Sequence, residues 1–233
     1  MKRRQLLEIS VESVEAATAA ERGGADRIEL CSNLREGGTT PSAELRRVAR
    51  ARLRVPIFIM VRPRAGDFVY SESEFEEMTQ EIAAAKECEM DGVVLGLLDA
   101  QGSVDVGRTR QLVELARPLP VTFHRAFDET RDLQVALEAV ISAGATRLLT
   151  SGGKPSAPEA LEPLAELVEK AGKRIVVMPG SGIHADNIKE VVKKTGAREY
   201  HAGLSSVVAR PAENLQAFEE AVRQLAAALA SSD

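Results

Sequence analysis

The sequence predicts a single-domain α/β fold, the (β/α)8 TIM barrel, and three observations support this prediction. Short β-branched runs alternate with longer segments of helical period, eight of each, along the 233 residues. A similar junction precedes every second strand, as four pairs of βα units would produce. The length corresponds to about 29 residues per unit, the usual size for this fold. A doubly wound open sheet is the alternative, but no GxGxxG fingerprint follows the first strand.

No linker or shift in composition divides the chain, so we expect residues 1–233 to form one domain. In chain order the predicted strands are Leu6–Ser10, Arg27–Ser32, Ile57–Arg62, Gly92–Leu98, Val121–Arg125, Arg147–Ser151, Arg174–Met178 and Glu199–Ala202. The helix after the second strand is predicted to open at Thr40-Pro41, a capping residue followed by proline. Ser71 and Glu74 have capping-box spacing and predict the start of the next helix.

Composition narrows the class of protein and of partner. Hydrophobic residues make up 44% of the chain and charged residues 28%, which excludes general disorder. The net charge of −5 argues against nucleic acid as a partner, and no apolar run is long enough to predict a membrane helix. Cys31 and Cys88 lack CxxC spacing and are expected to be reduced thiols. The first residues lead into no secretory apolar core, so we expect a cytoplasmic protein.

Polar residues interrupt strands that should be apolar on both faces in a barrel. Because side chains alternate between the two faces of a strand, Glu29 shares a face with Cys31, and His124 shares one with Thr122. We expect such polar groups to converge at the C-terminal mouth, where barrel active sites are built. The candidate catalytic residues are Glu8, Glu29, Arg62, His124, Arg125 and His201.

These residue types suit general acid–base chemistry, or a divalent metal held by two carboxylates and two imidazoles. His124 is the predicted base or ligand, oriented by Glu8 or Glu29. Two structural alternatives remain open. Glu29 and Arg62 could form an ion pair, and His124 could be a hydrogen-bonded core histidine.

The last three βα loops are rich in glycine and serine, which allows backbone N–H groups to approach an anion closely. Guanidinium groups after the third strand could clamp the same anion, and the loop 65–71 is long enough to form a lid. The predicted anion-binding residues are Arg64, Ser151, Gly180, Ser181, Gly182 and Ser205. Simple tight turns are the alternative explanation for the glycines.

Four segments carry a resemblance to a known family: Gly23–Ser32, Gly37–Ser42, Arg62–Phe68 and Thr122–Asp128. Together they resemble the motifs of the CutC family of copper homeostasis proteins. The resemblance implies a cytoplasmic (β/α)8 barrel that forms homodimers or higher homo-oligomers. It also implies copper handling, with Cys31 as the position most naturally assigned to Cu(I).

The residues and the resemblance point to different chemistry. Cu(I) prefers several soft ligands, so Cys31 would need His124, His201 or Met60 to complete a metal site. A mouth lined by carboxylates, arginines and histidines instead resembles an enzyme for a small anionic ligand. Two hypotheses therefore stand: an intracellular copper-binding protein, or a barrel enzyme, with or without a metal, that acts on a phosphorylated or carboxylated small metabolite.

Overall fold

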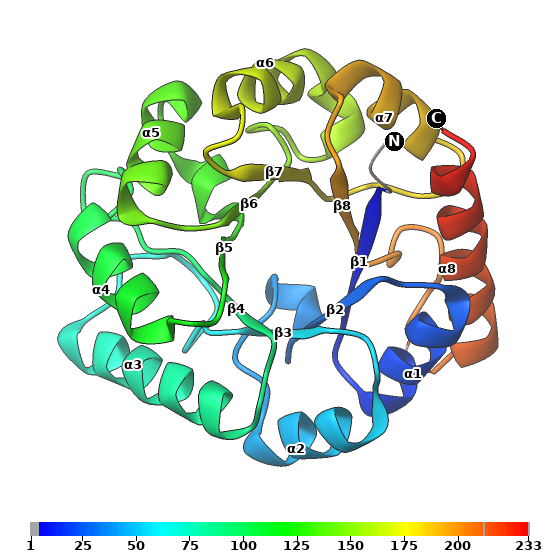
Figure 1. The fold of residues 1–233 in the computed structure, drawn as a ribbon, viewed down its shortest axis with the longest axis horizontal. Coiled ribbons are helices and arrows are strands. Elements are labelled where there is room, and N and C mark those ends of the chain that lie inside the picture. Colours follow the sequence, from blue (N-terminus) through cyan, green and yellow to red (C-terminus); the bar gives the residue numbers. More distant parts are fainter. Residues whose placement is uncertain (1–4, 212, 233) are drawn as a thin grey trace.

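The computed structural model describes residues 5–211 and 213–232, and it confirms the predicted barrel. Eight parallel strands pair in the order β7-β6-β5-β4-β3-β2-β1-β8, and β7 and β8 meet at the seam of a nearly closed barrel (Figure 1). The strands are β1 (Leu6–Val11), β2 (Arg27–Leu30), β3 (Ile57–Met60), β4 (Gly92–Leu95), β5 (Val121–Phe123), β6 (Arg147–Thr150), β7 (Val176–Pro179) and β8 (Glu199–Ala202).

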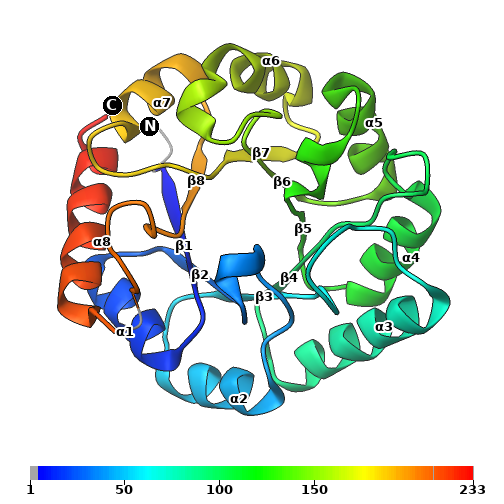
Figure 2. The ribbon, with the colours of Figure 1, turned by 180° about the vertical axis from the view of Figure 1, so that it is seen from behind.

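Within the described residues, eight α-helices surround the strands, and three short 3-10 helices lie in the loops that follow β2, β5 and β6. The α-helices are α1 (Val14–Gly23), α2 (Ala43–Arg52), α3 (Glu72–Glu87), α4 (Val106–Ala116), α5 (Leu133–Ala143), α6 (Leu161–Ala171), α7 (Ile188–Thr195) and α8 (Leu215–Ala230); the 3-10 helices are η1 (Leu34–Glu36), η2 (Arg125–Glu129) and η3 (Ala157–Glu159). Seen from behind, η1 lies near the barrel axis, in front of the strands (Figure 2).

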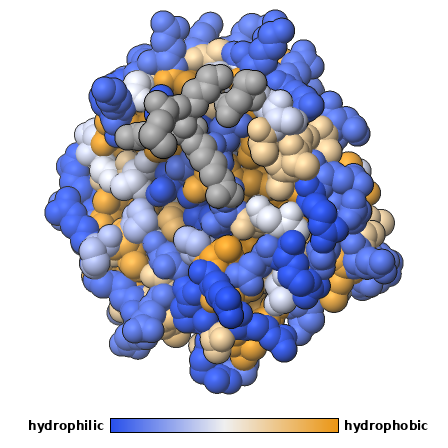
Figure 3. Space-filling model, turned by 45° about the vertical axis from the view of Figure 1, so that its right-hand side comes forward, coloured by the Kyte–Doolittle hydropathy of each residue, from blue (hydrophilic) through white to orange (hydrophobic). Residues whose placement is uncertain are grey.

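On the side shown in Figure 3, hydrophilic residues dominate the surface and hydrophobic ones are scattered between them. This pattern fits helices that turn their apolar faces toward the strands. In the described part of the chain, no helix combines the length and the apolar character needed to cross a bilayer.

One predicted helix start is confirmed and one is wrong. Ser71 and Glu74 form a capping box at the start of α3. Helix α2 begins at Ala43 and is capped by Ser42, not by Thr40. Thr40 instead bonds the backbone of Arg62: its hydroxyl accepts from the Arg62 N–H at 2.9 Å and lies 3.1 Å from the Arg62 carbonyl oxygen. Thr40 therefore ties the end of β3 to the loop before α2.

Charged side chains fill the interior of the barrel at the N-terminal ends of its strands, the end opposite the mouth. The guanidinium carbons of Arg27 and Arg147 lie 4.8 and 5.3 Å from the centre of the Phe58 ring. Both arginines donate to Glu199, at 2.8 and 2.9 Å. The Phe58 ring lies against Gly92, where an added Cβ would come within 2.5 Å of it. Glu199, the first residue of β8, therefore lies below the mouth and anchors two cations.

We expect Gly92→Ala to destabilise the barrel by about 1–3 kcal/mol, because the new methyl group must displace the Phe58 ring inside a packed interior. Gly107→Ala is the control: this glycine is exposed in α4, and alanine is expected to add up to about 1 kcal/mol of stability. Urea unfolding of both variants measures the difference. Equal midpoints would contradict the tight contact between Phe58 and β4.

Candidate functional site

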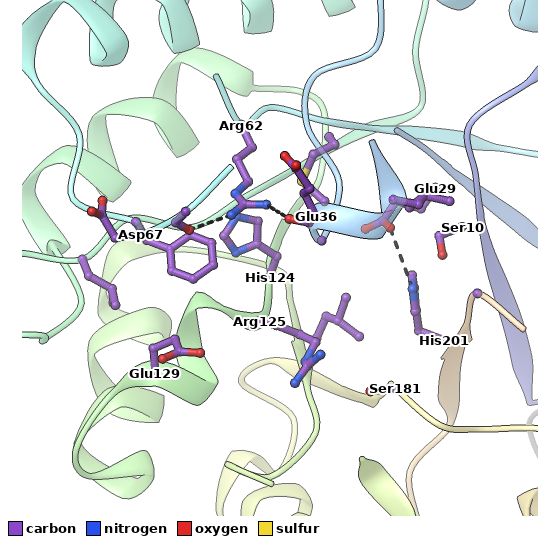
Figure 4. Close-up of a pocket in the computed structure, with 18 of the residues that line it drawn as sticks. Ser10, Glu29, Glu36, Arg62, Asp67, His124, Arg125, Glu129, Ser181 and His201 are labelled. Atoms are coloured by element: carbon purple, nitrogen blue, oxygen red, sulfur yellow. Dashed lines mark hydrogen bonds and ion pairs between the residues drawn. The ribbon is translucent and has the colours of Figure 1, made fainter. Parts of the chain in front are cut away.

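A cavity of about 890 Å³ opens at the C-terminal mouth of the barrel. Glu29, Arg62, His124 and His201 contribute to its wall, and Figure 4 shows them around one space. They reach it from β2, β8 and the ends of β3 and β5, as the alternation of side chains along parallel strands requires.

Glu8 fixes the orientation of His201. One carboxylate oxygen of Glu8 lies 2.7 Å from His201 Nδ1, and the other accepts from Arg27 Nε. Burial raises the pKa of Glu8, but Arg27 and His201 outweigh it and lower that pKa to about 2. Glu8 is therefore an ionised carboxylate that accepts a hydrogen bond from Nδ1–H of His201. This bond leaves Nε2 of His201 directed toward Glu29.

Glu29 is buried beside this histidine, with 3% of its surface exposed. Its Oε2 lies 3.8 Å from His201 Nε2 and accepts from the Cys31 thiol at 3.5 Å, while Oε1 has no partner among the described residues. Burial raises the pKa of Glu29. Burial lowers the pKa of His201, but Glu29 and Glu8 outweigh it and raise that pKa. The two groups thus compete for a proton at the bottom of the cavity.

His124 stands in a different environment. Its Nδ1 accepts the Ala126 N–H at 3.1 Å, so Ala126 orients the ring, and not Glu8 or Glu29 as the sequence suggested. The ring centre lies 5.0 Å from that of Phe68, and Nε2 is buried without a partner in the described part of the chain. Burial and the charge of Arg62 lower the pKa of His124 to about 3, so the ring is neutral at pH 7.

Arg62 does not form the ion pair with Glu29 that the sequence left open. Its guanidinium donates to the carbonyl oxygens of Glu36, Gly38 and Gly66 at 2.8–2.9 Å. The Nε of Arg62 has no partner among the described residues. Arg62 therefore joins the η1 loop to the loop 65–71 across one side of the mouth.

The predicted anion-binding residues separate into two groups. Arg64 does not line the cavity, because Asp67 and Glu74 engage its guanidinium at 2.9 and 2.6 Å. Ser151 and Gly180 also lie outside the wall. Those that do line the cavity are Ser181, Gly182 and Ser205.

Arg125 also reaches the cavity, with 43% of its side chain exposed at the rim. It pairs with Asp128 at 2.9 Å and donates to the Ser151 hydroxyl at 3.0 Å. It is therefore the cavity arginine that is most open to an incoming anion.

The atoms that could hold a metal ion come from Glu8, Glu29 and His201, which offer ligand atoms within 4.8 Å of one another. Within the described residues, the predicted set of Cys31, His124 and His201 does not form such a group. Burial, and then the neighbouring Glu29, raise the pKa of Cys31, so its sulfur is a protonated thiol. The assembled group offers oxygen and imidazole ligands, which suit a divalent ion better than Cu(I).

Sequence reasoning missed three residues of this region. Arg27 shares the inner face of β2 with Glu29, and the period of two could have identified it. Phe68 lies in the predicted lid and contacts both His124 and Arg62. Gly96 lies directly against the His124 ring, where an added Cβ would overlap Nδ1. The sequence could not predict this contact, because it depends on the side chain that glycine lacks.

Comparison with known proteins identifies the family. A family model described as the CutC family matches residues 5–206. The chain belongs to the CutC family. This CutC-family protein is 50% identical over 205 residues to the "family protein CutC" of Chromobacterium violaceum, covering 88% of this chain and 83% of that one. It is 49% identical over 201 residues to the human "copper homeostasis protein cutC homolog", covering 86% and 74% of the two chains.

Solved structures agree with the fold. A putative copper homeostasis protein CutC from Streptococcus agalactiae superposes with a TM-score of 0.81 at 33% identity, covering 85% of this chain and 98% of the other. Thiamine phosphate pyrophosphorylase from Pyrococcus furiosus superposes with a TM-score of 0.65 at 22% identity, covering 98% and 96%. The second likeness supports the barrel fold alone.

The depressed pKa of His124 predicts a pH-dependent loss of stability in this CutC-family protein. The unfolded chain takes up a proton near pH 6.5 and the folded chain only near pH 3, so stability falls as the pH drops between these values. From pH 7 to pH 5 the stability advantage of wild type over His124→Gln should shrink by about 2 kcal/mol. Urea unfolding at both pH values measures it. A constant difference would show that His124 titrates alike in both states.

Proposed function

We propose that this protein is a barrel enzyme that transfers a proton on a small organic anion bound at the mouth, with Glu29 and His201 as the proton-transferring pair. The observation that carries the proposal is the buried carboxylate of Glu29, which lies beside His201 and faces a cavity with one oxygen unpartnered among the described residues. General bases commonly combine burial, a raised pKa and access to a cavity in this way.

The charges around the pair support this role. Arg27 and Arg147 balance the carboxylates of Glu8 and Glu199 through direct contacts. Glu29 Oε2 lies 3.8 Å from His201 Nε2, while Nδ1 of the same ring is held by Glu8. One proton can move between them without changing the net charge of the interior, so the energetic cost of either arrangement stays low.

The cavity favours a small anionic substrate. Its volume of about 890 Å³ suits a metabolite-sized molecule. The half-exposed guanidinium of Arg125 lies at one rim, and the loop at Ser181-Gly182 lines the cavity from β7. These groups could hold a carboxylate or a phosphate while the reacting atoms reach Glu29. A divalent ion at the Glu8–Glu29–His201 group would be a metal-assisted form of the same enzyme.

Copper binding is a second candidate function. The human relative is named a copper homeostasis protein homolog. In this chain Cys31 and Met60 pack in one cluster, and atoms of both lie 3.3–3.4 Å from where a Cβ on Gly38 would stand. Thiolate and thioether sulfur are donors that Cu(I) prefers. Here Cu(I) would be a cargo of the protein, held in a cytoplasm that keeps Cys31 reduced.

Glu29→Gln tests the proposed enzyme. A panel of small carboxylated and phosphorylated compounds is first screened for thermal stabilisation, and turnover of those that bind is followed by NMR. We expect kcat to fall by about 10²–10⁴-fold in Glu29→Gln, because the base is lost while the fold is kept. Glu15→Gln, an exposed change on α1, should retain wild-type turnover. Full activity of Glu29→Gln would refute the role of Glu29.

Anaerobic titration with Cu(I) against a competing chelator tests the second candidate. If copper binds at the Cys31–Met60 cluster, wild type takes up Cu(I) stoichiometrically and Cys31→Ser does not, because the thiolate is the strongest soft ligand there. Cys88→Ser is the matched control, since Cys88 lies outside the cavity at the end of α3. Uptake that is indifferent to Cys31 would contradict copper binding at this site.

A further inference from the structure

His124 is held as a donor of one defined N–H group. Its Nδ1 accepts from the backbone N–H of Ala126, so the neutral ring carries its proton on Nε2. Gly96 closes one side of the ring and Phe68 packs near it at 5.0 Å between ring centres. A ring confined in this way presents Nε2 in one position, as a preorganised hydrogen-bond donor should.

His124 is only 4% exposed, so its Nε2–H group is buried. This group nevertheless has no hydrogen-bond acceptor within the described residues. Nε of Arg62 likewise forms no hydrogen bond within the described residues. The Tyr70 hydroxyl lies near this guanidinium, whose carbon is 4.8 Å from the centre of the Phe68 ring. The side chains of His124 and Arg62 line the cavity that also contains Glu29. Buried donors without acceptors are unfavourable, and a ligand oxygen would satisfy them.

We propose that His124 Nε2–H and Arg62 Nε–H form the binding site for the carbonyl oxygen of the substrate, which is a small organic acid with a C–H bond next to that carbonyl. This inference rests on the proposed function and assigns its substrate class. Glu29 takes the proton from the carbon as the C–H bond breaks. The electron pair of that bond becomes the enolate, whose oxygen His124 and Arg62 stabilise. The Glu29–His201 pair then returns the proton to another position of the enolate, which gives an isomer of the substrate.

The arrangement of donors and base favours a carbonyl oxygen over a permanent anion at this position. Burial and the nearby charge of Arg62 keep His124 uncharged, so the imidazole adds no positive charge beyond that of Arg62 to offset a standing negative one. A neutral N–H donor suits an oxygen that is uncharged in the ground state and gains charge during the reaction. The permanent charge of the acid would meet Arg125 at the rim.

The test is NMR of protein labelled with 15N in its imidazoles, which is tractable because the chain has only three histidines. Oxalate is the probe, since its planar dianion resembles the enolate of a 2-keto acid. At pH 7 we expect His124 as the Nε2–H tautomer, with a resonance that shifts saturably as oxalate is added. A response to inorganic phosphate but not to oxalate would overturn the carbonyl assignment. So would the Nδ1–H tautomer, a charged ring, or no saturable shift.

Three variants sharpen the result. In Gly96→Ala the new methyl group displaces the ring, so the response to oxalate should be lost while the barrel remains folded. His124→Gln can present an N–H near the position of Nε2, whereas His124→Asn retains only an acceptor near Nδ1. For any substrate found in the compound panel, kcat should fall about 10²–10³-fold in His124→Asn and less in His124→Gln. Equal losses in the two variants would contradict a donor role.

Failure of this inference and failure of the proposed function would give different results. Glu29→Gln should abolish turnover but keep the oxalate-induced shift of His124, because the donors are intact. An inactive Glu29→Gln together with an unresponsive His124 in wild type would refute this inference alone. An active Glu29→Gln with a responsive His124 would refute the proton-transfer role of Glu29 and leave the oxygen-binding site standing.

Discussion

Glu8 carries a negative charge on the inner face of the first strand, where water does not reach it. Its two oxygens are held by Arg27 on β2 and His201 on β8, the two strands that flank β1 in the sheet. Leaving such a carboxylate unpaired would cost several kcal/mol, more than a marginally stable domain can lose without consequence. The register of β1 with both neighbours brings these partners to it. The barrel can therefore place a histidine and further carboxylates near its axis.

Glu8 and its partners lie between two levels of the barrel interior, one at the N-terminal ends of the strands and one at the mouth. Below Glu8, Glu199 accepts from Arg27 and Arg147 against the Phe58 ring, which fills this level with mutually neutralised groups. Above Glu8, Glu29 lies beside His201 Nε2 and the Cys31 thiol, while His201 Nδ1 keeps its bond to Glu8. The unsatisfied atoms of Glu29, Arg62 and His124 lie at this upper level, where a ligand can enter.

Most of the fold could be predicted from the sequence, because the alternation of strands and helices is a repeated, local signal. All eight strands appear within a few residues of the predicted ranges. The start of α2 could not be predicted, since Thr40 has a tertiary partner in Arg62 that outweighs its local capping tendency.

The site was predictable as a set of inward-facing residues but not as a set of contacts. The period of two identifies Glu29 and His201 on inner faces, whereas which group orients His124 depends on the turn after β5, where Ala126 turns its N–H back to the ring. The guanidinium of Arg62 likewise donates to backbone carbonyl oxygens in two loops. Every residue has such an oxygen, so the sequence does not indicate which ones an arginine will bond. Arginine at a barrel mouth suggests an anion clamp, yet here its two terminal NH2 groups hold loops together.

The contact between Cys31 and Glu29 connects the two functional hypotheses. The thiol donates to Glu29, and burial together with this carboxylate raises the pKa of Cys31. Cu(I) binding would turn the thiol into a thiolate beside a second negative group, and a single positive charge cannot offset both. Copper would therefore be held most easily when Glu29 is protonated, the state in which Glu29 cannot act as a base. The same carboxylate would thus decide which of the two proposed chemistries the mouth of this barrel supports, and the two proposed activities would compete for one proton.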